Sequence, residues 1–122
     1  MNKKILLIDD NEHIVEAVTL ILTTEDYDVI SFTEIKDIIK EVKKIKPDLI
    51  LLDLLLSGGN GKDATTLLKN DKATGNIPII IISAHPSAKT AAMEAKADAF
   101  LAKPFDIAVL LALVEKYTSP TH

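Results

Sequence analysis

The sequence contains no cysteine, no arginine and no tryptophan, and each absence removes a class of function. Without cysteine there is no disulfide framework and no thiolate chemistry. Without arginine there is no planar guanidinium group to hold a phosphate through two parallel hydrogen bonds. Any phosphate chemistry in this chain must therefore use lysine, a metal ion or backbone N–H groups.

Aromatic residues and long apolar runs are also scarce. Two Tyr and three Phe are too few to support stacking on nucleic-acid bases, and a net charge of −4 argues against a surface dedicated to nucleic acid. No stretch reaches the roughly 18 apolar residues of a membrane span, and the apolar run near the N-terminus is too short for a signal peptide. We therefore expect a cytoplasmic protein with no membrane segment and no direct nucleic-acid partner.

The composition that remains is that of one globular domain. The chain has 122 residues, of which 48% are hydrophobic and 26% are charged, and both fractions are ordinary for a soluble domain with a real core. We expect a single domain over residues 1–122. Its core extends from about residue 3 to residue 117, and residues 118–122 form a short frayed tail.

Short apolar runs alternate with helical patterns along the chain. Five strands are predicted, at Lys4–Ile8, Asp28–Phe32, Asp48–Leu52, Pro78–Ile82 and Ala99–Ala102. The first four are continuous, or nearly so, in Ile, Leu and Val, which is typical of strands covered on both faces. The fifth is weaker.

The segments between the predicted strands carry apolar residues at helical spacing, and each such stripe is expected to face the core. The stripes are Ile14, Val18, Ile21 and Leu22; Ile35, Ile38, Ile39 and Val42; Ala64, Leu67 and Leu68; and Ile107, Leu110, Leu111 and Val114. A further segment, Ser87–Ala95, is rich in alanine and can be helical by propensity, but it has little apolar bulk to anchor it.

This alternation predicts an α/β fold of the (βα)5 type, with a doubly wound parallel five-stranded sheet and right-handed crossovers. In such a sheet with strand order 2-1-3-4-5, ligands bind beyond the carboxyl ends of the strands, where the order reverses between the first and third strands. Those two strands end in Asp9-Asp10 and in Asp53. The acidic residues therefore fall where the topology places a crevice.

Asp53 interrupts a long apolar run, and burying a charged group without partners costs several kcal/mol. It either ends a strand and caps a turn, or it is delivered to a rim where a cation or a reaction requires it. Asp10 has a similar alternative, because either Asp10 or Asn11 could cap the helix that follows. Three neighbouring carboxylates repel one another unless one is protonated or a cation joins them. Hard oxygen ligands in this number suit Mg²⁺.

Two further strand ends carry polar groups. Ser83 follows the fourth strand, where its hydroxyl either forms a simple turn or points into the crevice. Lys103 follows the fifth strand, where it is either a solvated surface charge or a cation that reaches a carboxylate or phosphate. Pro104 biases Lys103 toward an extended backbone and suits the start of the last helix. Together these groups could support phosphoryl transfer to a carboxylate.

At this point the chain resembles the receiver domain of two-component response regulators, over about residues 3–117. The marks of the resemblance are Asp9-Asp10, Asp53, Gly61, Ser83-Ala84, Phe100 and Lys103-Pro104-Phe105, in this order along a (βα)5 pattern. The resemblance implies a flavodoxin-like receiver fold and a phosphoprotein in a phosphorelay. Asp53 would accept a phosphoryl group from a sensor histidine kinase or a histidine phosphotransfer protein. The protein would then relay the phosphate or bind an unknown downstream target.

The resemblance also implies a role for each neighbouring residue. Mg²⁺ would be bound by Asp9, Asp10, Asp53 and the backbone carbonyl of Leu55. Ser83 would bond a phosphoryl oxygen, and Lys103 would pair with Asp53 before phosphorylation and with the phosphate afterwards. The remaining family roles fall to Ala84, which leaves room for the phosphoryl group, Phe100, a rotating aromatic, and Pro104, a turn or cis position.

Several features depart from the family pattern. Ser57 stands where proline is usual, Lys96 stands where glycine is common, and the stretch from Ser83 to Lys103 is about two residues short. An apolar Leu55 would poorly orient an attacking water, which predicts slow self-dephosphorylation.

We expect a stand-alone regulator that is not a conventional enzyme, and phosphorylation-dependent dimerisation stays open. Its conformational switch is expected at Ser83, Phe100 and the short fourth helix. One alternative is a receiver-like binding module that no longer uses phosphate. The other, an acid-phosphohydrolase-like enzyme, would need a carboxylate at the position of Leu55.

Overall fold

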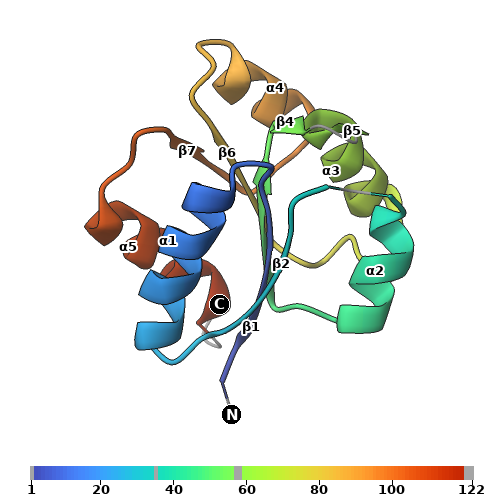
Figure 1. The fold of residues 1–122 in the computed structure, drawn as a ribbon. Coiled ribbons are helices and arrows are strands. Elements are labelled where there is room, and N and C mark those ends of the chain that lie inside the picture. Colours follow the sequence, from blue (N-terminus) through green and yellow to red (C-terminus); the bar gives the residue numbers. More distant parts are fainter. Residues whose placement is uncertain (1, 35, 57–58, 120–122) are drawn as a thin grey trace.

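The computed structural model describes residues 2–34, 36–56 and 59–119, which include a central sheet of five parallel strands (Figure 1). The strands are β1 (Lys4–Ile8), β2 (Asp28–Phe32), β3 (Leu49–Asp53), β6 (Ile79–Ser83) and β7 (Ala99–Ala102). Their order in the sheet is β2-β1-β3-β6-β7. This confirms the predicted α/β fold with strand order 2-1-3-4-5. Strands β3 and β6 begin and end one residue later than predicted.

Helices cover both faces of the sheet. On one side lie α1 (Glu12–Thr24) and α5 (Ile107–Thr118), and on the other lie α2 (Ile38–Ile45), α3 (Gly61–Asn70) and α4 (Ala88–Glu94) (Figure 1). The predicted tail was wrong at its first residue, because α5 continues through Thr118. That residue is buried, and its hydroxyl donates to the Val114 carbonyl over 2.7 Å.

The core has two halves because successive side chains of a strand point to opposite faces. On the side of α2, α3 and α4, the sheet contributes Leu6, Ile8, Ile50, Leu52, Ile79 and Ile81. On the side of α1 and α5, it contributes Ile5, Leu7, Leu49, Leu51, Ile80, Ile82 and Leu101. Three central strands are therefore apolar on both faces, and this explains their continuous Ile and Leu content.

The expectation that every stripe residue faces the core was wrong for two residues. Leu67 is 57% exposed and Ile107 is 54% exposed, because each lies at the margin of its helix's buried arc. Another residue of the predicted stripes, Ile35, lies outside the described residues. The edge strand β2 was also expected to be covered on both faces, yet it is only partly buried because a single neighbour, β1, flanks it.

A second, two-stranded sheet was not expected. It pairs β4 (Leu55–Leu56) with β5 (Gly59–Asn60) in antiparallel fashion and leads from β3 into α3. Elements this short leave no periodic signal in a sequence. Ser57, which stands where proline is usual in the family, and Gly58 lie outside the described residues.

Helix α4 is the most lightly anchored of the helices. Its buried residues are Ala88 and Ala92, so only methyl groups hold it against the sheet. The chain leaves it through Lys96, whose φ of 66° lies in the left-handed region that glycine adopts without strain. No helix in the described ranges is both long enough and apolar enough to cross a membrane.

Candidate phosphoacceptor site

The register of the sheet brings four strand ends together. Ile8 of β1 is paired with Leu52 of β3, so Asp9 and Asp53, each one residue further, lie side by side. On the other flank of β3, Asp53 is paired with Ile82, and the next residue of β6 is Ser83. These three side chains therefore meet at the carboxyl edge of the sheet, as the sequence predicted.

Asp9 is fully buried, and both of its carboxylate oxygens have partners. Oδ1 accepts the backbone N–H of Asn11 at 2.9 Å, and Oδ2 lies 2.8 Å from Nζ of Lys103. A buried carboxylate needs such partners, because its desolvation is otherwise costly. Asp9 is thus held in one orientation by the start of α1 and by the lysine that follows β7.

Lys103 reaches the cluster because Ser83 of β6 is paired with Ala102 of β7, one residue before it. Its Nζ lies 3.7 Å from Asp53 Oδ2, which is a longer separation than that to Asp9. Lys103 is therefore not a solvated surface charge. The pairing with Asp53 that the resemblance implied is present, but Asp9 is the nearer partner.

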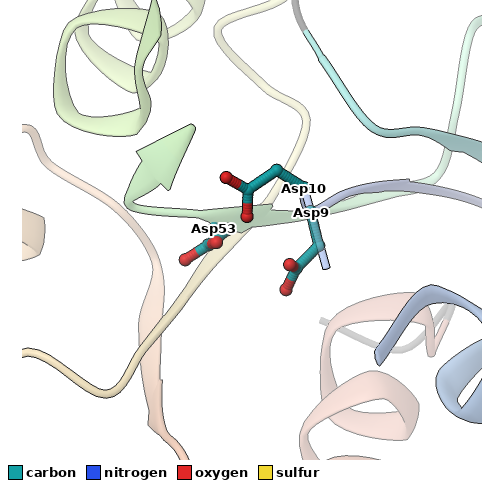
Figure 2. Close-up of side chains that lie close together, drawn as sticks. All are labelled: Asp9, Asp10 and Asp53. Atoms are coloured by element: carbon teal, nitrogen blue, oxygen red, sulfur yellow. The ribbon is translucent and has the colours of Figure 1, made fainter. Parts of the chain in front are cut away.

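Asp10 is exposed and does not cap α1. The cap is Asn11, whose Oδ1 accepts the backbone N–H groups of His13 and Ile14. Figure 2 shows the carboxylate groups of Asp9, Asp10 and Asp53 gathered at the end of the sheet, and one oxygen from each lies within 4.8 Å of the others.

The three carboxylates fit a hard divalent cation. Three oxygen ligands with one exposed member leave room for water, which is the coordination that Mg²⁺ favours. The described part of the chain offers no comparable group of histidines that would favour zinc instead. Asp9, Asp10 and Asp53 are therefore the residues that could hold Mg²⁺.

An open cavity of about 500 Å³ lies over Asp53. Its lining residues are Asp10, Asp53, Ser83, Ala84, His85, Pro86 and Lys103. Ser83 is 3% exposed, and its Oγ accepts the backbone N–H of His85 at 3.0 Å. The simple turn considered for Ser83 thus exists, and it uses the hydroxyl as an acceptor, so the O–H remains able to donate to a group in the cavity.

Gly61 allows α3 to start against the end of β3. Its N–H donates to the Leu54 carbonyl over 2.8 Å. A Cβ at this position would overlap the Asp53 carbonyl oxygen and would lie 2.8 Å from Leu54 Cα. The absence of a side chain at Gly61 therefore lets the backbone that carries Asp53 keep its position.

The remaining predicted residues lie around the site in different ways. Phe100 is in β7, partly buried against the core on the α4 side, and is not among the described residues lining the cavity. Leu55 is in β4, two residues beyond Asp53, and its side chain lies outside the described part. The peptide bond between Lys103 and Pro104 is cis.

The sequence analysis made no prediction for the contacts of His85, whose side chain contacts Ser87 in the structure. The ring Nδ1 accepts the backbone N–H of Ser87 at 3.2 Å and lies 2.8 Å from Ser87 Oγ. The spacing His-x-Ser just before a helix was the available signal, because serine commonly occupies the position at which a helix begins.

Comparison with known proteins gives a consistent picture. Residues 5–115 match the family model described as the response regulator receiver domain. The DNA-binding response regulator MtrA of Mycolicibacterium paratuberculosis is 32% identical over 116 residues, which cover 93% of this chain and 50% of that protein. The chain spans about half the length of the curated relatives it matches.

Solved structures agree on the fold. A response regulator from Chloroflexus aurantiacus aligns with a TM-score of 0.91 and 27% identity, covering 98% of this chain and 99% of that one. The receiver domain of a sensor histidine kinase from Pseudomonas aeruginosa, which has a magnesium ion in its active-site cleft, aligns with a TM-score of 0.88 and 23% identity. That alignment covers 97% of this chain and 98% of the other.

Proposed function

Because the chain belongs to the response regulator receiver domain family, we propose that it is a phosphoacceptor whose Asp53 takes a phosphoryl group from a phosphohistidine. The donor is a sensor histidine kinase or a histidine phosphotransfer protein. The observation that carries the proposal is the convergence of Asp9, Asp10 and Asp53 within 4.8 Å, with the ammonium group of Lys103 against two of them.

The transfer needs only one covalent exchange. A carboxylate oxygen of Asp53 forms a bond to phosphorus while the P–N bond of the phosphohistidine breaks. The electron pair of that bond returns to the imidazole nitrogen, which takes up a proton. The product is an acyl phosphate, and the protein catalyses its own modification rather than turning over an outside substrate.

The surrounding residues supply position and charge, which is most of what phosphoryl transfer requires from a protein. Mg²⁺, held by Asp9, Asp10 and Asp53 with the Leu55 carbonyl, would screen the negative charge of the phosphoryl oxygens. Lys103 has its ammonium group within reach of Asp53 and can follow the phosphoryl group. The Ser83 hydroxyl, whose acceptor side is occupied by His85, donates to a phosphoryl oxygen.

Incubation with Mg²⁺ and acetyl phosphate, followed by intact-mass measurement, tests the proposal. We expect the protein to gain the mass of one phosphoryl group and the Asp53→Asn variant to gain none. Asp63→Asn is the matched control, because it makes the same chemical change at an exposed position in the first turn of α3. No gain in mass, or a gain that survives Asp53→Asn, would favour a binding module that does not use phosphate.

A further inference from the structure

His85 lines the acceptor cavity, and the chemistry proposed above uses only its backbone. The residue is exposed, yet hydrogen bonds between its ring and Ser87 hold the side chain in one orientation. An exposed histidine held in one orientation at the edge of a reactive carboxylate needs an explanation. The backbone supplies part of the explanation, because the His85 N–H donates to Ser83 Oγ at 3.0 Å.

The contacts of the ring determine its tautomer. A backbone N–H can only donate, so the Nδ1 atom that accepts from Ser87 N must carry a lone pair. A neutral imidazole with an unprotonated Nδ1 carries its hydrogen on Nε2. With Nδ1 engaged by Ser87, the Nε2–H group is the polar group of the ring that remains for the cavity.

Ser87 is used in an unusual way. It occupies the N-cap position of α4, but its side chain makes no capping hydrogen bond. Serine at this position ordinarily accepts an N–H group of the first helical turn. Here Ser87 Oγ lies 2.8 Å from His85 Nδ1 instead, so the side chain holds the imidazole rather than the helix.

The charge of the cavity indicates what the Nε2–H group of His85 could bind. An acyl phosphate on Asp53 brings several negative oxygens into a cavity where Lys103 is the one cationic side chain among the described lining residues. The chain has no arginine to add a second. A neutral N–H donor would satisfy a further phosphoryl oxygen without adding to the cost of burying charge.

We propose that His85 is a further phosphoryl-binding residue of the acceptor site, donating a hydrogen bond from Nε2–H to a phosphoryl oxygen, and that Ser87 is a positioning residue that sets the tautomer. The inference rests on the proposed function, because it presumes a phosphoryl group on Asp53. The inference adds a residue that contacts the phosphoryl group and is hydrogen-bonded to Ser87, the N-cap residue of α4.

Binding of beryllofluoride in the presence of Mg²⁺ tests the proposal, with this complex standing in for the phosphoryl group on Asp53. At a pH where imidazole is neutral, we expect His85→Ala to weaken binding about fivefold, the effect of losing one hydrogen bond of ordinary net strength. His85→Gln should retain most of the affinity, because the side-chain amide also donates. His13→Ala, at an exposed histidine of α1, is the matched control and should bind as the unaltered protein does.

Nitrogen-15 NMR of the imidazoles gives a readout that does not depend on phosphorylation. We expect the Nε2–H tautomer for His85 in the unaltered protein, and the same tautomer in Ser87→Ala, because that variant keeps the backbone N–H that donates to Nδ1. Equal beryllofluoride affinity for His85→Ala and the unaltered protein, or an Nδ1–H tautomer, would overturn the inference. If the unaltered protein bound no beryllofluoride although its His85 is the Nε2–H tautomer, the phosphoacceptor function itself would have failed, and the inference would fail with it.

Discussion

Replacing Lys103 with methionine removes a positive charge from the carboxylate cluster and leaves a side chain of similar length. Lys103 Nζ lies 2.8 Å from Asp9 and 3.7 Å from Asp53, and the exposed fractions of the Lys103 and Asp9 side chains are 17% and 0%. In the absence of divalent metal, we expect the free energy of unfolding to fall by about 3 kcal/mol, near the lower end of the cost of breaking a buried ion pair.

The magnitude follows from the distances in the site. At an effective dielectric constant of about 20, two unit charges 4.8 Å apart repel by roughly 3.5 kcal/mol. On the same basis, a positive charge 2.8 Å from a carboxylate oxygen contributes roughly 6 kcal/mol of attraction. Without Lys103 the three carboxylates lose the positive charge that lies nearest to Asp9 and Asp53. Water reaches the exposed Asp10 and weakens the repulsion. We therefore expect a loss of unfolding free energy near the lower end of the cost of breaking a buried ion pair.

Urea unfolding in the presence of a chelator measures this change, and Lys62→Met is its control. Lys62 Nζ also lies 2.8 Å from a carboxylate, that of Glu94, but these side chains are 39% and 58% exposed. An exposed pair contributes about 0.5 kcal/mol or less, so the two substitutions differ in burial and not in distance. Adding Mg²⁺ should raise the stability of Lys103→Met more than that of the unaltered protein, because bound metal then supplies the missing charge.

Two results would refute this reasoning. The first is a loss of less than about 0.5 kcal/mol for Lys103→Met in chelator, the value expected of an exposed pair. The second is a loss of equal size for both lysine variants. Either would mean that burial does not strengthen the pairing of Lys103 with the acidic cluster.

Three further predictions concern other parts of the chain. Gly61→Ala should lower the free energy of unfolding by about 2 kcal/mol, since a new Cβ must displace the backbone at Leu54; chemical denaturation measures the loss. The hydrogen bond from the Ala73 N–H is the main cause that lowers the pKa of Asp71, aided by the charge of nearby Lys43. The carboxylate therefore stabilises the folded state above its ordinary pKa of 3.8, and this contribution is lost as the pH falls through the lower folded value. The difference in unfolding free energy between the unaltered protein and Asp71→Asn should be constant at neutral pH and shrink under acid conditions. Finally, an apolar Leu55 should leave the phosphorylated protein with a half-life well beyond seconds, as followed by the decay of the phosphorylated mass.

The parts of the fold that could be predicted are those in which burial dictates residue type. Strand β1 has its predicted bounds because an Ile and Leu run ends where the first aspartates begin. The convergence of Asp9, Asp53 and Ser83 followed from topology alone, because the carboxyl ends of parallel strands share one edge. A one-residue error in β3 and β6 did not alter this conclusion.

The parts that could not be predicted depend on distances between loops. Nothing in the sequence tells whether Lys103 lies nearer to Asp9 or to Asp53, since both carboxylates end neighbouring strands. The exposure of Leu67 and Ile107 depends on how far each helix rolls against the sheet, and helical spacing does not encode this. The bond between His85 and Ser87 depends on the turn after β6, for which two polar residues at this spacing have several conformations.

The buried side chains of helix α4 are those of two alanines, Ala88 and Ala92, and the partly buried Ala91 packs beside them. A methyl group buries little apolar surface, and each buried carbon of this kind contributes only about 0.8 kcal/mol. A helix that buries so little apolar surface can slide or rotate while the rest of the hydrophobic core keeps its packing. Hydrogen exchange should find its amides among the fastest of the described helices, so the segment that follows His85 and Pro86, two residues lining the cavity over Asp53, should rearrange at little cost.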